Sequence, residues 1–600
     1  MAKTLVHQRF QAISPDRYNA AMTASIQYRI TAANPRAHLF HVTLTVTDPG
    51  PAGCRLSLPA WIPGSYMIRE FARHIVQISA RAGRHPVKLT KTDKHTWQAA
   101  PCVGTMTIEY EVYAWDLSVR AAHLDESHSF FNGTSVFLRV HGSEEARHEV
   151  EIVRPTGRAF TAWRVATSLP RTGATPALGF GRYLAASYDE LIDHPVEMGN
   201  FALAEFSACG VPHQVVITGR HDCDLARVTA DLKQVCEAHI RLFHGERAAR
   251  RDVPFERFVF LVMAVGDGYG GLEHRASTAL ICSRHDLPHA DMKTSTEGYR
   301  TFLGLCSHEY FHAWNVKRIK PAAFTPYDLT QENYTGLLWA FEGITSYYDD
   351  LMLLRSGLIT LPEYLDTLAR AIRGVLRGSG RLKQPVADSS FDAWIKYYRQ
   401  DENAPNAIVS YYAKGALVAL CLDLLLRTGT RGARSLDDVM RLLWQEFGSR
   451  NTGVPEDGIE QAVYRTGGAA LKRKLAAFFR DAVHGTRDLP LIALLREAGF
   501  KLTIEPGGAP SLGARTATVP EGVRLTHVLD GGGAQAAGLS AGDVVLAIDG
   551  LKVSTDSLER RLTRKGRGAS VEVHAFRRDE LISRTVKLGA SELTVKLEKA

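Results

Sequence analysis

The sequence contains few cysteines, and they follow no regular arrangement. Among its 600 residues there are eight cysteines, and no two of them form a CxxC pair. Neither a zinc ribbon nor a disulfide framework is therefore predicted. Buried free thiols in a reducing compartment account most simply for this pattern. The eight residues are Cys54, Cys102, Cys209, Cys223, Cys236, Cys282, Cys306 and Cys421.

Long hydrophobic runs are also missing. No stretch approaches the roughly 20 apolar residues that a membrane-spanning helix needs. Residues 1–30 contain no continuous apolar segment and no clear small-residue cleavage site, so a secretory signal is not expected. The sequence thus predicts a cytoplasmic protein without a membrane partner.

No strong excess of one charge sign is present. The formal net charge is +8, and short basic clusters such as residues 247–251 give way quickly to apolar sequence. This pattern favours a solvated surface over a nucleic-acid-binding face. Hydrophobic residues make up 45% and charged residues 23% of the chain, which is ordinary for a soluble globular protein.

What is present is a change of periodicity along the chain. Apolar and polar residues alternate in segments such as 39–46, 106–113 and 136–140, which predicts a β-sandwich-like domain at the N-terminus. Helical spacing follows at 222–243, and then an apolar strand at 258–262. Because the chain is too long for a single hydrophobic core, we expect a multidomain α+β protein.

The second half of the chain has a different texture. Long helical segments, including 416–426, dominate from Tyr299 to about residue 496. A Gly- and Pro-rich break at 506–510 marks the last domain boundary, and short strands return beyond it.

His308, Glu309 and His312 form an HExxH motif. On a helix, residues i and i+4 lie on one face, so both imidazoles can reach one cation. The segment from Arg300 to Trp314 contains no proline and suits a helix. Glu309 lies beside the two histidines, where a carboxylate can take a proton from a water on the metal. The motif predicts a zinc site with Glu309 as general base.

Glu342 is the expected third metal ligand, because catalytic zinc usually has three protein ligands. It lies in a largely apolar segment, 338–348, that reads as a helix. A lone carboxylate among aromatic side chains is costly unless it is paired or bound to a metal. A salt-bridged helix glutamate is the alternative for Glu342. Glu332 is a rival ligand, but its surroundings look like an exposed loop.

HEYFHAWNVKRIKP followed by WAFEGITSYY resembles the gluzincin metallopeptidases, in which a glutamate of an EG-containing helix completes the HExxH site. The separation from His312 to Glu342 is longer than in the common aminopeptidases of that clan. Together with WIPGSY at 61–66 and a PDZ-like C-terminus, it makes the chain similar to the glycyl aminopeptidase family of gluzincins. The resemblance implies one Zn²⁺ per chain and four domains. They are an N-terminal β domain (1–205), a thermolysin-like catalytic domain (206–365), a helical domain (366–504) and a PDZ domain (505–600).

The resemblance also implies a substrate-binding strand. Gly270, Gly271 and Glu273 resemble the GxMEN strand of clan aminopeptidases, whose glutamate binds the α-amine of the substrate. Glu273 is accordingly the candidate amine anchor, and an exposed edge-strand glutamate is the alternative. His274 stands where those enzymes have asparagine, which leaves the rest of the strand's role open.

Tyr412 is the candidate for stabilising the transition state. The segment 411–415 resembles the YxKG segment of the clan, whose tyrosine bonds the tetrahedral intermediate. The register to Gly415 favours Tyr412 over Tyr411. Asp349 or Asp350 is able to accept an N–H from a metal-bound imidazole, but solvated helix charges are the favoured reading of both.

The C-terminal segment resembles a PDZ domain, through the GLxxGDxIxxIxG-like pattern at 538–550. Leu512 and Gly513 fall in the loop that receives a peptide carboxylate in such domains. A C-terminal peptide is thus a possible partner, and packing against the catalytic part is the alternative.

These features predict a zinc aminopeptidase acting on peptides with a free N-terminus, and the resemblance implies that the residue removed is small, Gly or Ala. Two alternatives remain. One is a zinc endopeptidase in which Glu273 is structural. The other is a peptide-binding PDZ scaffold with an idle metal site.

Overall fold

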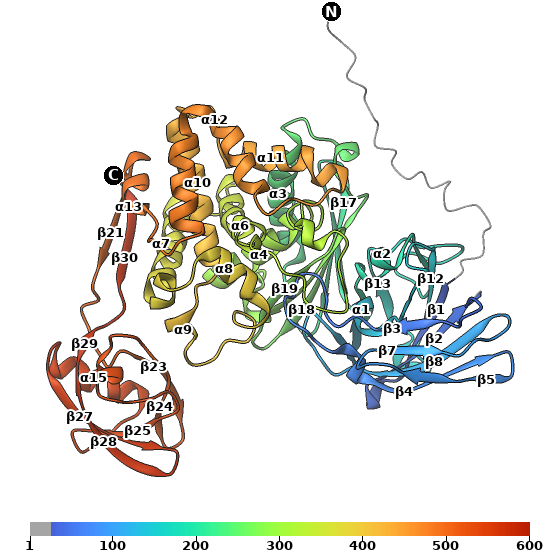
Figure 1. Ribbon diagram of the computed structural model, residues 1–600, viewed down its shortest axis with the longest axis horizontal. Coiled ribbons are helices and arrows are strands. Elements are labelled where there is room, and N and C mark those ends of the chain that lie inside the picture. Colours follow the sequence, from blue (N-terminus) through green and yellow to red (C-terminus); the bar gives the residue numbers. More distant parts are fainter. Residues whose placement is uncertain (1–25, 48) are drawn as a thin grey trace, which may run out of the picture. The chain divides into compact units, whose positions relative to one another are not determined.

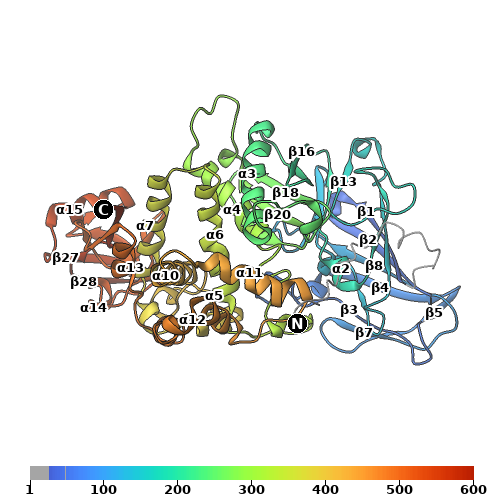
Figure 2. The ribbon, with the colours of Figure 1, turned by 90° about the horizontal axis from the view of Figure 1, so that it is seen from above.

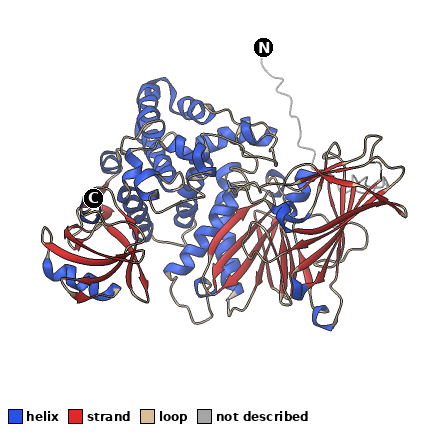
Figure 3. Ribbon diagram, turned by 60° about the horizontal axis from the view of Figure 1, so that its bottom comes forward, coloured by secondary structure: helices blue, strands red, loops and turns tan. Residues whose placement is uncertain are grey.

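The computed structural model describes residues 26–47 and 49–600. The chain divides into two compact units: unit 1 runs to Ala313 and includes Leu329–Gln331, and unit 2 comprises Trp314–Asp328 and Glu332–Ala600. Both units contain helices and strands (Figure 3), which confirms the predicted multidomain α+β class. Within the described residues, no helix is both long enough and apolar enough to cross a membrane.

A seven-stranded sheet forms the largest part of the N-terminal β domain. Its strands are antiparallel to their neighbours except β1 and β12, which run parallel. In β1, β2 and β8 buried residues alternate with more exposed ones, as the period of two in the sequence predicts. In spatial order the strands are β14 (Gly181–Ala185), β12 (His148–Val153), β1 (Ile26–Asn34), β2 (Leu39–Val46), β8 (Met106–Tyr113), β4 (Ile75–Ala82) and β5 (His85–Val87).

Two four-stranded sheets complete this domain. One has the order β13 (Arg164–Ala166), β15 (Val196–Gly199), β10 (His128–Phe131), β9 (Ala122–Leu124). The other has the order β11 (Arg139–Val140), β3 (Arg55–Ser57), β7 (Thr96–Ala99), β6 (Leu89–Lys91). Two short helices, α1 (Gly133–Val136) and α2 (Tyr188–Ile192), lie between strands.

The strand expected at 136–140 is mostly absent, and only Arg139–Val140 forms β11. Tyrosine hydroxyls take the backbone carbonyls that a neighbouring strand would need: Tyr110 donates to Val136 O at 2.7 Å, and Tyr28 donates to Leu138 O at 2.6 Å. Tyr188 donates in the same way to the carbonyl of the residue between them. The segment is buried on both sides, so the apolar run reflects core packing and not a half-buried strand.

The remainder of unit 1 is a five-stranded sheet covered by two helices. Strand β18 is buried along almost its whole length, which explains its apolar sequence. Helix α4 (Glu297–Phe311) packs on β19 and β20, while α3 (Leu225–His244) packs on β16 and on α4 (Figures 1 and 2). The strand order is β16 (Ala202–Ala208), β17 (Val211–Thr218), β18 (Phe258–Val265), β20 (Ser277–Ser283), β19 (Tyr269–Glu273), with β19 antiparallel at the edge.

Unit 2 begins with a set of helices arranged around α10. At the closest contact a Cβ on Gly343 would lie 2.5 Å from the Cα of Gly415, so the absence of side chains allows α6 and α10 to approach. The helices are α5 (Leu338–Phe341), α6 (Gly343–Arg355), α7 (Leu361–Arg377), α8 (Val386–Phe391), α9 (Ala404–Ala407), α10 (Ala413–Gly429), α11 (Leu436–Glu446), α12 (Gly458–Phe478) and α13 (Leu491–Glu497).

The C-terminal part of unit 2 begins and ends with two strands that pair with each other and form a two-stranded ribbon. Strand β21 (Phe500–Glu505) pairs with the last strand, β30 (Thr594–Lys599), and the ribbon packs on α7 and α13. Between them lies a small barrel-like fold with its own apolar core, which includes Val545 and Val573. Its elements are β22 (Pro510–Ser511), β23 (Ala514–Val519), β24 (Gly522–Val528), α14 (Gly533–Ala536), β25 (Val544–Ile548), β26 (Leu551–Lys552), α15 (Thr555–Lys565), β27 (Ser570–Arg577), β28 (Glu580–Lys587) and β29 (Gly589–Ala590).

Candidate metal centre and active site

The HExxH motif occupies the last turn of α4. The helix begins at Thr296, whose hydroxyl accepts from the Tyr299 amide at 3.1 Å, and it ends with His312 as the C-cap. The Nε2 atoms of His308 and His312 lie 3.1 Å apart. The structure therefore brings these two predicted ligands together on one face of the helix, as the i, i+4 spacing requires.

This histidine pair fits a divalent metal ion. Two imidazole nitrogens that face each other at 3.1 Å form an arrangement that a shared cation or proton stabilises. Imidazole nitrogen is a usual ligand of zinc. His312 is almost completely buried, and His308 is half-buried. Of the two predicted ligands, His312 is thus fixed inside the protein, whereas His308 borders more open space.

Two buried hydrogen bonds fix α4 on the surrounding structure. His239 on α3 bonds the Ser307 hydroxyl at 2.9 Å, and His213 on β17 bonds the Tyr310 hydroxyl at 2.9 Å. Burial lowers the pKa of His213 to about 4, so this imidazole is neutral at neutral pH. These contacts limit rotation of the helix about its axis and so hold the directions of the two metal-binding side chains.

Glu309 is buried against the backbone of β19. A Cβ on Gly271 would lie 2.1 Å from Oε1 of Glu309, so only glycine leaves room for the carboxylate. Next to it, a Cβ on Gly270 would meet Cγ2 of Ile281 at an ordinary 3.6 Å. Of the two glycines predicted to bind substrate, Gly271 is therefore the one that shapes the site around Glu309.

Glu273 is also buried, with an exposed fraction of 3%, although it lies on an edge strand. The alternative of an exposed edge-strand glutamate is therefore wrong. Glu273, Glu309 and His312 each offer a side-chain ligand atom, and these atoms lie within 4.8 Å of one another. Among the described residues none hydrogen-bonds Oε1 of Glu273. A buried carboxylate with an open acceptor position is suited to receive an ammonium group.

The residue after Glu273 anchors the end of β19. The His274 imidazole contacts Asp193 at 3.3 Å, and the other carboxylate oxygen of Asp193 accepts from the Arg275 amide at 3.0 Å. All of these contacts lie in or near the interior of unit 1. His274, whose role the sequence left open, thus belongs to the network that positions the strand carrying Glu273.

Two residues of the N-terminal β domain reach this site without having been predicted there. A Cβ on Gly64 would lie 2.5 Å from Oε2 of Glu273, and Gly64 has a φ of +93°. Arg120 donates from Nη2 to the Gly271 carbonyl at 3.3 Å. The Pro63-Gly64 pair is a turn signal that offered a clue, whereas no local pattern marks Arg120.

In unit 2, Glu342 lies between α5 and α6, with φ −98° and ψ −43°. These dihedral angles are helical, and the Glu342 amide donates to the Leu338 carbonyl at 2.7 Å while its own carbonyl accepts from the Ser346 amide at 2.8 Å, so the predicted helical segment continues through the glutamate. Glu342 is 2% exposed, whereas Glu332 is half-buried and lies outside any helix. Asp349 and Asp350 follow on α6 at half-buried positions. Burial favours Glu342 over Glu332 as the functional carboxylate of this unit.

Tyr411 and Tyr412 precede α10, and their rings stack 4.7 Å apart. Tyr411 is fully buried, and Tyr412 is partly exposed. Burial raises the pKa of the Tyr411 hydroxyl, and the nearby Tyr398 hydroxyl and Glu342 carboxylate raise it further. The Tyr412 hydroxyl lies 3.4 Å from that of Tyr398. Its partial exposure favours Tyr412 as the tyrosine able to meet a substrate, in agreement with the register argument.

The loop predicted to receive a peptide carboxylate is tightly bound within the C-terminal domain. The Leu512 side chain lies in the apolar core, and its carbonyl accepts from the Ala534 amide at 2.7 Å. The Gly513 amide donates to the Ser511 hydroxyl at 3.0 Å. Gly513 has a φ of +76°, and a Cβ there would lie 2.6 Å from the Cα of Gly532. The neighbouring strand β23 is at the edge of its sheet, where an added strand is able to pair.

Three family models match separate parts of the chain. The model of the Peptidase M61 N-terminal domain matches residues 27–200, and that of the M61 glycyl aminopeptidase matches residues 301–418. A PDZ domain model matches residues 510–588. The second of these ranges contains the HExxH motif, Glu342 and Tyr412.

Solved structures give a similar result. The aminopeptidase N family protein from Idiomarina loihiensis is 41% identical, with a TM-score of 0.91 over 96% of this chain and 98% of that chain. An M1 zinc metallopeptidase from Deinococcus radiodurans is 14% identical, with a TM-score of 0.48 over 78% of this chain and 94% of that chain. None of the curated proteins compared with the chain matches it.

Proposed function

Because the chain belongs to the M61 glycyl aminopeptidase family and is a peptidase, we propose that it removes a small N-terminal residue, Gly or Ala, from peptides with a free N-terminus. The observation that carries this proposal is the buried Glu273 carboxylate beside Glu309 and His312. The preference for a small residue is supported by the family. The eight free cysteines support a reducing compartment such as the cytoplasm.

His308, His312 and Glu342 would hold one zinc ion. The converging imidazoles of His308 and His312 support this assignment, and so does the burial of Glu342 among apolar side chains. When bound, the metal would lower the pKa of a water molecule and polarise the carbonyl of the scissile bond.

Glu309 would act as the general base and then as the general acid. Its carboxylate takes one proton from the attacking water and later gives it to the nitrogen of the departing peptide. Gly271 lets Glu309 lie flat against β19, so the direction of the carboxylate is fixed by backbone. A fixed base spends little free energy on reorientation during the reaction.

Glu273 would bind the α-ammonium group of the substrate. This contact fixes the number of residues between the free N-terminus and the reacting carbonyl, so cleavage is restricted to the first peptide bond. Gly64 closes one side of the Glu273 carboxylate, and His274 anchors the strand that carries it. An ammonium ion pairs well there because the carboxylate is buried and keeps an open acceptor position.

Tyr412 would donate its hydroxyl proton in a hydrogen bond to the oxygen that becomes negative in the transition state. A donor of this kind is worth about 2.7–4 kcal/mol in other hydrolases. Partial exposure of Tyr412, beside the buried Tyr411, supports this role.

Replacing Glu273 tests the proposal. With Glu273→Ala, we expect kcat/KM on glycine and alanine chromogenic amides to fall about 100-fold or more, because the ammonium loses its partner. Glu205→Gln, at an exposed position on the opposite edge strand of the same sheet, is the matched control and should leave the rate unchanged. If wild-type protein cleaves N-acetylated peptides as fast as free ones and Glu273→Ala changes neither rate, the protein is an endopeptidase and not an aminopeptidase.

A further inference from the structure

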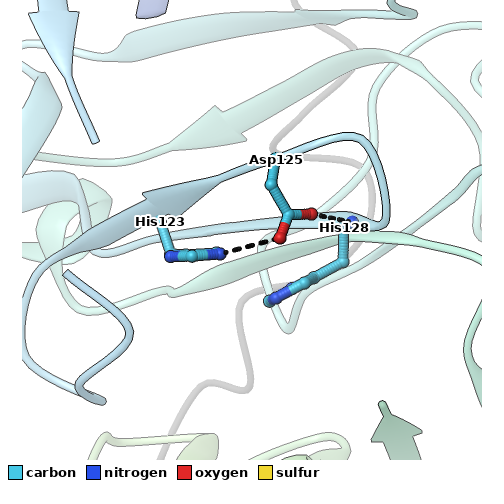
Figure 4. A group of neighbouring side chains, drawn as sticks. All are labelled: His123, Asp125 and His128. Atoms are coloured by element: carbon cyan, nitrogen blue, oxygen red, sulfur yellow. Dashed lines mark hydrogen bonds and ion pairs between the residues drawn. The ribbon is translucent and has the colours of Figure 1, made fainter. Parts of the chain in front are cut away.

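A second group of metal-binding side chains lies in the N-terminal β domain, separate from the HExxH helix. His123 on β9, Asp125 in the following turn and His128 at the start of β10 each offer a ligand atom, and these atoms lie within 4.8 Å of one another (Figure 4). None of the three is used in the proposed peptidase mechanism. Two imidazoles and a carboxylate are a donor set suited to zinc.

The orientation of His128 is fixed in the manner of a metal ligand. Its Nδ1 lies 3.1 Å from Oε1 of Glu197 on β15, and that same oxygen accepts from the Thr218 hydroxyl at 3.0 Å. All three residues are buried. A carboxylate on one imidazole nitrogen directs the lone pair of the other nitrogen outward and raises its basicity, which is the usual arrangement behind a metal-bound histidine.

The side chain of Asp125 is half-buried and is held in one orientation by hydrogen bonds. Asp125 accepts hydrogen bonds from the Ser127 hydroxyl and from the backbone amides of Ser127 and His128. These donors occupy Oδ1, at 2.6 Å from the hydroxyl and 3.0 Å from the His128 amide. Oδ2 instead points to Nε2 of His123 at 3.4 Å, so it lies on the side of the imidazoles.

His123 is buried, and one of its ring nitrogens is available for a further contact. Within the described part of the chain nothing hydrogen-bonds its Nδ1, although this atom is inaccessible to solvent. Its ring stacks on His128 at 4.9 Å and on the half-exposed Trp115 at 4.9 Å. Because a ligated metal lies near the plane of each imidazole, one of the stacked rings has to turn when a metal binds.

We infer that His123, Asp125 and His128 form a second zinc-binding site, with Glu197 supporting His128 and a water completing the coordination. The site would tie β9 to β10 across their turn.

Zinc content of the full-length protein tests this site. After zinc loading and removal of loosely bound metal, wild-type protein should contain two zinc ions per chain, as measured by inductively coupled plasma mass spectrometry. Asp125→Asn should contain one, because the amide keeps the Oδ1 acceptor of the turn but replaces Oδ2 by a poor ligand. Asp116→Asn is the matched control, since Asp116 accepts from the Ser118 amide in a similar turn outside the group. It should keep both ions.

A variant without the first site separates this inference from the proposed peptidase. His308→Ala should abolish hydrolysis and still bind one zinc ion in a calorimetric titration, and Asp125→Asn added to it should remove that binding. Asp125→Asn alone should keep the wild-type rate on glycine amides. A wild-type content of one zinc ion, or a titration of His308→Ala that Asp125→Asn leaves unchanged, overturns the second site. In that case His123 and His128 are only two stacked imidazoles, each in contact with a carboxylate.

Discussion

At the scale of the residue, glycines position the side chains of Glu309 and Glu273, the two carboxylates of the candidate active site in unit 1. Gly271 and Gly64 each come so close to a carboxylate that any Cβ would overlap it, at 2.1 Å from Glu309 and 2.5 Å from Glu273. Both carboxylates are buried. The side chains thus lie against rigid backbone, which leaves them few alternative rotamers and holds them close to the geometry that catalysis needs.

Gly271→Ala should therefore lower activity without unfolding the protein. The new methyl group overlaps the Glu309 carboxylate and must push it aside, and a displacement of about 1 Å costs on the order of 100-fold in rate. We expect kcat on a glycine amide to fall by that factor, with a melting temperature close to that of wild type. Gly270→Ala is the internal comparison, because its Cβ finds an ordinary contact at 3.6 Å and should cost much less. Equal losses in the two variants would show that Gly271 does not place Glu309.

At the scale of the element, helices α6 and α10 are joined through two glycines. A Cβ on Gly343 would lie 2.5 Å from the Cα of Gly415, and one on Gly415 would lie 2.6 Å from the Trp339 carbonyl oxygen. These atoms belong to backbone and cannot move aside as a flexible side chain does. The contact brings the start of α10, after Tyr412, close to the start of α6, after Glu342.

Two glycine-to-alanine changes in neighbouring helices should consequently have opposite effects. Gly343→Ala forces α6 away from α10 and should destabilise the protein by about 1–3 kcal/mol. Gly374→Ala lies on α7, where nothing would be within 4 Å of the new Cβ, and should stabilise by about 0.5–1 kcal/mol through helix propensity. Urea unfolding followed by circular dichroism measures both. A stabilising Gly343→Ala would mean that the close packing of α6 and α10 does not exist in solution.

Periodicity predicted many of these elements but not their interruptions. The segments 39–46 and 106–113 form β2 and β8 with the expected bounds, because one face of each strand is buried and the other is not. The segment 136–138 failed because its apolar residues are buried by tyrosines from distant strands, which local spacing does not report.

The candidate site likewise contains some residues that the sequence predicted and others that it did not. His308, Glu309 and His312 follow from the geometry of a single helix, so a short motif was enough to predict their proximity. The apolar helical setting of Glu342 pointed to it as the third ligand, the resemblance to a family pointed to Glu273, and the comparisons confirm the family itself. Arg120 and Gly64 reach β19 only through the fold of the N-terminal β domain. No spacing in one sequence encodes a contact between segments so far apart.

At the scale of the whole molecule, the PDZ domain is tied to the helices of unit 2 by more than its connecting chain. The Asn406 side chain donates to the Val528 carbonyl at 2.8 Å and accepts from the Asp530 amide at 2.9 Å. The Asp530 carboxylate accepts in turn from the Ser379 hydroxyl at 2.8 Å. With the ribbon of β21 and β30, these bonds restrain the domain at several points.

Several histidines have a pKa shifted away from the ordinary value, and the shifts go in both directions. In unit 1, burial lowers the pKa of His148, His213 and His244 to about 4 and that of His194 to about 3. In unit 2, by contrast, the hydrogen bond to Glu460 raises the pKa of His484. An unfolded histidine has a pKa of about 6.5. Below that pH the unfolded chain binds protons at the four buried positions while the folded chain does not, until the pH reaches about 4.

Unit 1 should accordingly lose stability as the pH falls from about 6.5 to about 4, since the unfolded state then binds more protons than the folded state. For His213 alone, a folded pKa of about 4 corresponds to a loss of about 2 kcal/mol between pH 7 and pH 5. His213→Phe removes this proton-binding group, so its free energy of unfolding should decline less steeply over that interval, whatever its value at pH 7. Urea titrations of tryptophan fluorescence at pH 7, 6 and 5 measure the slope, with His85→Phe at an exposed position as the control. Equal slopes for wild type and His213→Phe would mean that His213 is already protonated in the folded protein, and that its contact with Tyr310 is not the neutral hydrogen bond that helps to hold the HExxH helix.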